Sequence, residues 1–82
     1  MYLQEVKTIL ADVLGLGAGA AALTEQSPLL GAIPELDSMA VVQLIAAMEE
    51  QFGFSVDDDE IDAATFASVG SLTAFVARKL TA

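Results

Sequence analysis

The sequence predicts an all-α fold: a small helical bundle of three main helices plus one short helix, with a long loop between helices 1 and 2. Three stretches repeat apolar residues at spacings of three and four, which is typical of helices with one face turned to a core. No stretch alternates apolar and polar residues strictly enough to indicate a strand. With 82 residues, the chain is expected to form a single domain, residues 1–82, with a core of limited size.

The first helix is predicted over residues 2–14. Gly15 and Gly17 follow it as a stop signal, because glycine readily adopts the left-handed conformation that ends many helices. The apolar side chains at helical spacing are Leu3, Val6, Ile9, Leu10, Val13 and Leu14.

The loop over residues 15–36 is interrupted repeatedly by Gly, Pro, Ser and Thr, and no single period runs through it. A loop of this length inside a small domain is uncommon, and is usually functional or partly structured. Its second half is too apolar to remain in water. We therefore expect four of its side chains to fold back onto the core: Leu29, Leu30, Ile33 and Leu36.

The second helix is predicted from Ser38 to Phe52, with Gly53 ending it. Asp37 or Ser38 caps its start, since a short side-chain oxygen there accepts a hydrogen bond from a free backbone N–H. The stripe predicted to face the core consists of Met39, Val42, Ile45, Met48 and Phe52, widened by Val41 and Leu44.

The acidic run at residues 57–60 suits the start of a short helix anchored by Ile61 and Phe66, because carboxylates favour the positive end of a helix dipole. The run lacks the alternating ligands, turn glycine and terminal Glu of a calcium loop, so no metal site is predicted. A last helix is predicted at about residues 70–80, with Leu72, Phe75, Val76 and Leu80 inward.

Composition limits the function. The chain has no Cys and no His, so it lacks a thiol nucleophile, the commonest general base and the commonest metal ligand. Its net charge of −9 repels nucleic acid and anionic lipid and attracts basic patches on proteins. Neither a signal peptide nor a bilayer-spanning stretch is apparent. We expect a cytoplasmic protein, monomeric, without enzyme activity, nucleic-acid binding or membrane insertion.

Ser38 has two interpretations. Ser and Asp are ordinary helix caps, and that interpretation needs no function. Against it, two capping residues stand together, the lead-in over residues 34–36 is expected to hold them at an exposed corner, and the helix carries the acidic pair Glu49 and Glu50. With no base to activate it, the Ser38 hydroxyl is inert on its own. The second interpretation is therefore that another enzyme attaches a group to Ser38.

The segment LDSMAVVQLIAAMEEQFGFSV resembles the modification-site segment of acyl carrier proteins: Asp-Ser, a bulky apolar residue, and an amphipathic helix ending in Glu-Glu-x-Phe. VKTILADVLGL resembles the first helix of that family, and FASVGSLTAFV resembles the segment that starts its last helix. Residues 16–33 are the least matched.

The resemblance implies that Ser38 carries 4′-phosphopantetheine, taken from coenzyme A, through a phosphodiester. Asp37 and Met39 are the adjacent members of the modification motif, and Asp37 helps the transferase hold metal or orient the serine. The implied function is that of an acyl carrier, which holds an acyl group as a thioester and delivers it to other enzymes. The arm would supply the thiol that the chain lacks, and the helix N-terminus favours its phosphate.

The implied partners are a phosphopantetheinyl transferase and acyl-activating or acyl-transferring enzymes with basic docking patches. By resemblance, Glu49 and Glu50 belong to the docking face, although without the resemblance a solvated face explains them. Four apolar residues of the same helix are interpreted as core, and the alternative that they line a groove for an acyl chain stays open: Val42, Leu44, Ile45 and Met48.

Some positions depart from the family pattern. Fatty-acid-synthesis carriers generally have Gly-x-Asp-Ser-Leu, where this chain has Glu-Leu-Asp-Ser-Met, and Ala40 and Gln43 replace acids that are frequent in the family. These differences favour a specialised stand-alone bacterial carrier over one for bulk fatty-acid synthesis. Two alternatives remain: an aminoacyl carrier of the D-alanyl type, and an unmodified acidic helical interaction module in which Ser38 is only a cap.

Overall fold

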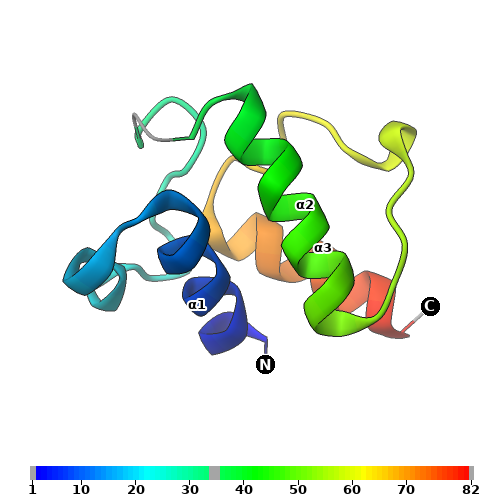
Figure 1. Cartoon of the computed structure of the whole chain (residues 1–82), viewed down its shortest axis with the longest axis horizontal. Helices are drawn as coiled ribbons and strands as arrows, with labels where there is room; N and C mark the ends of the chain where they lie inside the picture. Colours follow the sequence, from blue (N-terminus) through cyan, green and yellow to red (C-terminus); the bar gives the residue numbers. More distant parts are fainter. Residues whose placement is uncertain (1, 34–35, 82) are drawn as a thin grey trace.

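The computed structural model describes residues 2–33 and 36–81, apart from the side chains of Ala18, Ala20 and Asp58. Its α-helices form a bundle in which the first helix packs against both of the others (Figure 1). The helices are α1 (Leu3–Leu14), α2 (Ser38–Phe52) and α3 (Val69–Thr81), with two 3-10 helices, η1 (Gly17–Ala22) and η2 (Asp58–Glu60). The prediction of an all-α fold with three main helices is confirmed.

The first two helices end and begin as the sequence predicts. α1 ends at Gly15 (φ 67°) and α2 at Gly53 (φ 74°), both in the left-handed conformation that glycine adopts without strain. α2 begins after Asp37, whose Oδ1 accepts a hydrogen bond from the Ala40 N–H at 2.8 Å. Asp37 is therefore the N-cap of α2.

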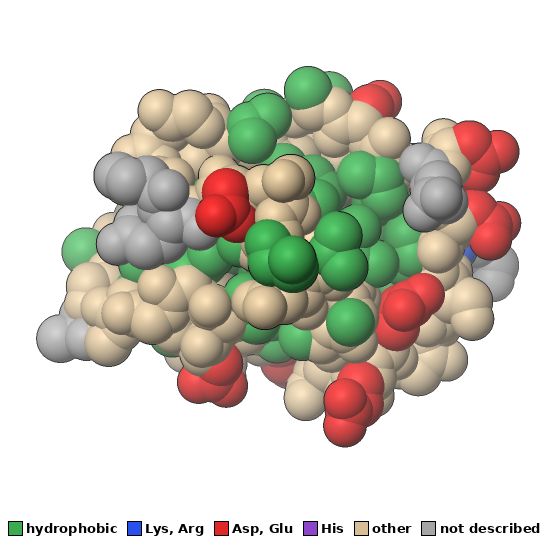
Figure 2. Space-filling view, turned by 45° about the horizontal axis from the view of Figure 1, so that its top comes forward, with side chains coloured by type: hydrophobic (Ala, Val, Ile, Leu, Met, Phe, Trp, Pro, Cys, Tyr) green, Lys and Arg blue, Asp and Glu red, His purple; other side chains and the backbone are tan. Residues whose placement is uncertain are grey.

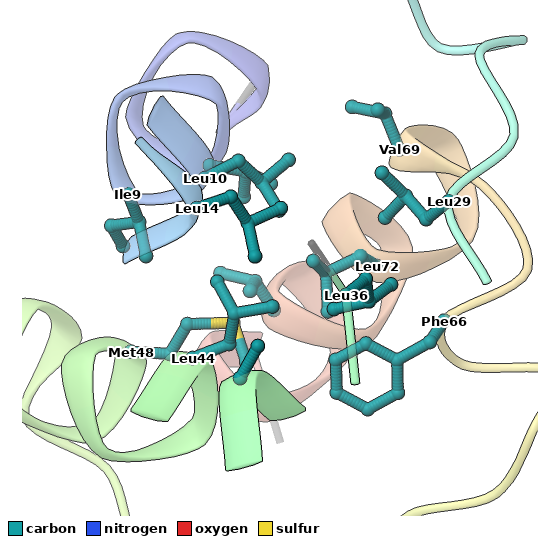
Figure 3. Packing of buried hydrophobic residues seen from close by; sticks show 13 residues of the cluster. Ile9, Leu10, Leu14, Leu29, Leu36, Leu44, Met48, Phe66, Val69 and Leu72 are labelled. Carbon is teal, nitrogen blue, oxygen red and sulfur yellow. The ribbon is translucent and has the colours of Figure 1, made fainter. Parts of the chain in front are cut away.

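The core is one cluster to which all three helices and the segments between them contribute (Figure 3). The inward faces predicted for the first and last helices are confirmed, although Leu3, Val13 and Leu80 are only partly buried. The buried residues of the helices are Val6, Ile9, Leu10 and Leu14 of α1, Ala40, Leu44 and Met48 of α2, and Val69, Leu72, Phe75 and Val76 of α3.

The predicted inward face of α2 is wrong at two positions. Met39 is 64% exposed and Val42 is 61% exposed, whereas the buried residues follow a spacing of four at Ala40, Leu44 and Met48. Every residue from 39 to 48 except Gln43 is apolar, so the hydrophobic pattern fits more than one face. Packing against α1 selects the face that is buried.

The long loop is held to the segment before α3 by backbone hydrogen bonds. Leu29 N–H donates to Ala67 O and Leu30 N–H to Phe66 O, both at 3.0 Å. Leu29 is fully buried, but Leu30 is 46% exposed, contrary to the prediction, because neighbouring residues of this bridged segment point to opposite sides. Leu36 is buried and Ile33 partly buried, as predicted. The expected position of residues 34–36 at an exposed corner rests on Pro34 and Glu35, which lie outside the described residues.

The same loop passes very close to the start of α3. Gly70 N–H donates to Glu25 O at 2.9 Å, and a Cβ at position 70 would lie 2.8 Å from that oxygen. Only glycine fits this approach of two backbones.

The acidic segment contains a 3-10 helix of three residues and no α-helix, so the predicted short helix anchored by Ile61 and Phe66 stays a prediction. One 3-10 turn, η2, is followed by turns over residues 63–66. Glu60 Oε1 accepts from the Asp57 N–H at 2.9 Å, and Asp62 Oδ1 accepts from the Thr65 N–H at 3.0 Å. Such hydrogen bonds from side chains to nearby backbone groups compete with continuous helix.

Candidate functional site

Ser38 is the first residue of α2, and its side chain is exposed. The preceding residue, Asp37, is also exposed and accepts from two backbone donors: Ala40 N–H at Oδ1 (2.8 Å) and Val41 N–H at its carbonyl oxygen (3.0 Å). Because Asp37 provides the cap, the helix start does not need the Ser38 hydroxyl. Of the two possible capping residues, Asp37 acts as the cap, and Ser38 is not needed for that role.

The start of α2 suits a phosphate on Ser38. The first N–H groups of a helix have no partner within the helix, and here the Asp37 side chain takes only that of Ala40. A 15-residue helix also presents the positive end of its dipole at this point. An exposed hydroxyl at such a position fits the phosphodiester that the family resemblance implies for Ser38.

The surroundings of Ser38 are apolar. Met39 and Val42, one and four positions further along α2, are both exposed. Hydrophobic side chains gather in the middle of the face that carries the start of α2, and most acidic side chains lie around its edge (Figure 2).

The structure places the two predicted docking residues in different surroundings. Glu50 is exposed, and lines a shallow groove between α1 and α2 together with Asp12. Glu49 is half-buried, and its Oε2 accepts a hydrogen bond from the Val56 N–H at 2.8 Å. Glu49 therefore also ties the segment after α2 to the helix.

The four residues considered for an acyl groove also differ in their burial. Leu44 and Met48 are fully buried in the core, Ile45 packs against it half-buried, and Val42 faces solvent. The core interpretation holds for the first two, and Val42 belongs to the exposed surface near Ser38.

Sequence reasoning missed a cluster at the other end of α2. The ring of Phe52 stacks on that of Phe54 at 5.8 Å between centroids and meets Tyr2 edge-on at 6.0 Å. Lys79 Nζ lies 6.0 Å from the centroid of Phe54 and forms an ion pair with Glu60 at 2.8 Å. The sequence signal for this cluster is the position of its aromatic residues: Phe52 and Phe54 lie around the end of α2, and Tyr2 lies at the start of the chain.

Glu60 is the one group whose pKa departs clearly from its ordinary value in the described part of the chain. The hydrogen bond from the Asp57 N–H, followed by the hydrogen bond and charge of Lys79, holds the pKa of the Glu60 carboxyl below its usual range. Within those same residues, no three acidic side chains are placed to hold a metal ion, and no helix is long and apolar enough to cross a membrane.

The chain is a three-helix bundle in which an aspartate caps the second helix and an exposed serine follows it. This combination is typical of one class of protein, the small helical carrier domains. Comparison with known proteins agrees. The family model described as a phosphopantetheine attachment site matches residues 4–76. The chain therefore belongs to the acyl carrier protein family, whose covalent cofactor is 4′-phosphopantetheine, and the resemblance found in the sequence is confirmed.

Relatives and a solved structure are consistent with this assignment. An acyl carrier protein of Nitratidesulfovibrio vulgaris (strain DP4) is 39% identical over 59 residues, which cover 70% of this chain and 71% of the relative. One from the Miyazaki F strain is 33% identical over 78 residues, 93% of each chain. The solution structure of a holo acyl carrier protein from Nitrosomonas europaea is 58% identical, with a TM-score of 0.94 over 100% of this chain and 99% of that one. These matches do not favour the aminoacyl and unmodified alternatives.

Proposed function

We propose that Ser38 is the residue that carries the 4′-phosphopantetheine arm of this acyl carrier protein. One observation supports this most directly: Ser38 is exposed at the start of α2, while Asp37 alone caps the helix. A serine retained only as a cap would be expected to accept the hydrogen bond that Asp37 accepts.

Attachment of the arm requires few groups of this chain. The Ser38 oxygen attacks the phosphorus of coenzyme A that bears the pantetheine, a new O–P bond forms, the pyrophosphate bond breaks and adenosine 3′,5′-bisphosphate leaves. The serine proton goes to a base of the transferase. Asp37, exposed beside Ser38, is the residue that helps the transferase hold its metal ion or orient the serine. The bound arm supplies the thiol on which an acyl group is held as a thioester.

Delivery of the acyl group requires docking to other enzymes. The acyl carrier family interacts with a phosphopantetheinyl transferase and with acyl-handling enzymes. We place Glu50, and the part of Glu49 that remains accessible, on the docking face for basic patches of those enzymes. Residues 1–82 act as one monomeric domain in the cytoplasm, carrying acyl groups for a specialised pathway and performing no catalysis of their own.

The test is the intact mass of the protein after incubation with coenzyme A, Mg²⁺ and a broad-specificity phosphopantetheinyl transferase. The wild-type protein should gain one phosphopantetheine, and Ser38→Ala should gain none. Ser55→Ala removes another exposed serine and should be modified like the wild type. Modification that persists in folded Ser38→Ala would place the arm elsewhere.

A further inference from the structure

The sulfur of this chain is confined to methionine. The chain has three Met and no Cys, Trp or His, so the thioethers are the side chains that a mild oxidant such as hydrogen peroxide attacks first. Two of them, Met39 and Met48, belong to α2. The third, Met1, lies outside the described residues.

The structure places the two thioethers of α2 in opposite surroundings. Met39 is 64% exposed in the first turn of the helix, directly after Ser38. Met48 is fully buried in the core. Because an oxidant has to reach the sulfur, Met39 is open to oxidation while the fold is intact, whereas Met48 is reached only when the fold opens.

Oxidation of Met39 changes the surface beside Ser38 and leaves the fold in place. The thioether is apolar, whereas the sulfoxide is polar and carries an oxygen that accepts hydrogen bonds. Met39 lies outside the buried core, and the cap from Ala40 N–H to Asp37 Oδ1 does not involve its side chain. A protein that reaches the Ser38 oxygen also covers Met39, the next residue, and then has to remove water from the sulfoxide at a cost in free energy.

We propose that Met39 is a reversible oxidation site, and that its sulfoxide slows attachment of the phosphopantetheine arm to Ser38. The effect on attachment rests on the proposed function of Ser38, whereas the oxidation of Met39 does not depend on it. The two parts can therefore be tested separately.

The oxidant is a peroxide, and the reductant is a dithiol. The Met39 sulfur gives an electron pair to one oxygen of hydrogen peroxide, an S–O bond forms and the O–O bond breaks. The other oxygen leaves as hydroxide and takes the proton of the first, so that water is released. The sulfur is oxidised and the peroxide is reduced. In the reverse step a methionine sulfoxide reductase removes the oxygen as water, and two thiols become a disulfide.

The first measurement locates the oxidation. The purified chain, without the arm, is treated with hydrogen peroxide, samples are quenched with catalase, and their peptides are sequenced by tandem mass spectrometry. Met39 should gain one oxygen at least about tenfold faster than Met48. In urea, where burial is lost, the two rates should be similar. Equal rates in the folded protein would overturn the proposal.

The second measurement tests the consequence for Ser38. After removal of the peroxide, kcat/KM for loading by the transferase, with coenzyme A and Mg²⁺, should be at least about fivefold lower than before treatment. Methionine sulfoxide reductases A and B with dithiothreitol should restore it, since each reduces one epimer of the sulfoxide.

Two variants provide matched controls, each compared with its own rate before peroxide. Met39→Leu keeps the size of the side chain and lacks sulfur, so peroxide should leave its rate unchanged. Met48→Leu should be slowed like the wild type, because its exposed Met39 remains. If peroxide slows Met39→Leu as much as the wild type, or if protein oxidised at Met39 is loaded at the untreated rate, the link to Ser38 is overturned.

Thermal unfolding separates an effect at the site from damage to the fold. The Tm of protein oxidised at Met39 should stay within about 4 °C of the untreated value, as for other changes at exposed positions. A larger fall would assign the slower loading to unfolding and overturn the link. A chain that is oxidised selectively at Met39 but never modified at Ser38 overturns the proposed function and the effect on loading, while supporting the oxidation site.

Discussion

The two ends of α2 are held in different ways. At its start, a single side-chain hydrogen bond from Ala40 N–H to Asp37 Oδ1 (2.8 Å) caps the helix, and Ser38 and Met39 face solvent. At its other end, Phe52 stacks on Phe54 and meets Tyr2 edge-on, and Glu49 Oε2 accepts a hydrogen bond from the Val56 N–H of the following segment (2.8 Å).

The start of α2 presents the candidate site, whereas the far end of α2 contributes to the stability of the fold. The start of α2 offers exposed groups to other proteins and contributes little burial of its own outside Ala40. Near the far end, Phe52 of α2 contacts Tyr2 at the start of the chain, and Lys79 of α3 contacts Phe54 and Glu60 in the segment after α2. Substitutions at the start should therefore alter modification more than stability, and those at the far end should do the reverse.

The largest effect on stability is expected at Phe52. Phe52→Ala removes the contacts with Tyr2 and Phe54 and should lower the free energy of unfolding by about 2 kcal/mol, less than for a fully buried Phe because Phe52 is half-buried. Urea denaturation measures the change. Val42→Ala, on the exposed face, should stay within about 0.5 kcal/mol of wild type. Equal losses in the two variants would remove the distinction between the ends.

The cap at the start of α2 is expected to matter less. Asp37→Ala leaves the Ala40 N–H without its acceptor and should cost about 1 kcal/mol. Asp37→Asn keeps a capping oxygen and should cost almost nothing, while slowing the loading of Ser38 because the carboxylate is gone. Thermal unfolding and intact-mass kinetics on the same two variants separate the roles. Loading of Asp37→Asn at the wild-type rate would leave Asp37 as a cap only.

The neighbours Glu49 and Glu50 provide a matched pair at the far end. Glu49→Ala loses the hydrogen bond to Val56 N–H and should destabilise the protein by about 1 kcal/mol, whereas Glu50→Ala should have little effect. Hydrogen exchange adds a local readout, since the Val56 amide should lose protection in Glu49→Ala alone. Similar exchange at Val56 in both variants would mean that the Glu49 contact does not hold the segment.

Parts of the molecule with short-range causes could be predicted from the sequence. The helix boundaries depend on Asp37, Gly15 and Gly53, whose effects on the backbone are local. The face of α2 could not be predicted, because residues 39–42 are all apolar and only packing against α1 decides which of them is buried.

Contacts between distant residues stayed hidden for a different reason. Glu49 pairs with the backbone of Val56, and Gly70 is required only because the Glu25 carbonyl passes it at hydrogen-bonding distance. Neither partner has a side chain or spacing that marks the contact in the sequence. The acidic run at residues 57–60 predicts the start of a short helix, and the structure has one 3-10 turn there, within which Glu60 Oε1 accepts a hydrogen bond from the Asp57 N–H.

The smallest predicted effect concerns Glu60. Its pKa is lowered in the folded protein, first by the Asp57 N–H and then by Lys79. The stabilisation that this carboxylate provides is therefore complete above its unfolded pKa and is lost as the pH falls through the lower, folded value. Lys79→Gln removes only the second cause.

We therefore expect the pKa of Glu60 in Lys79→Gln to rise toward its ordinary value without reaching it, because the bond from Asp57 N–H remains. An NMR titration of the Glu60 carboxyl carbon measures this pKa. Arg78→Gln changes the net charge equally in the same helical turn and should leave the pKa of Glu60 near its wild-type value. A full return to the ordinary value in Lys79→Gln would show that the ion pair, and not the Asp57 backbone, sets the pKa of this carboxyl.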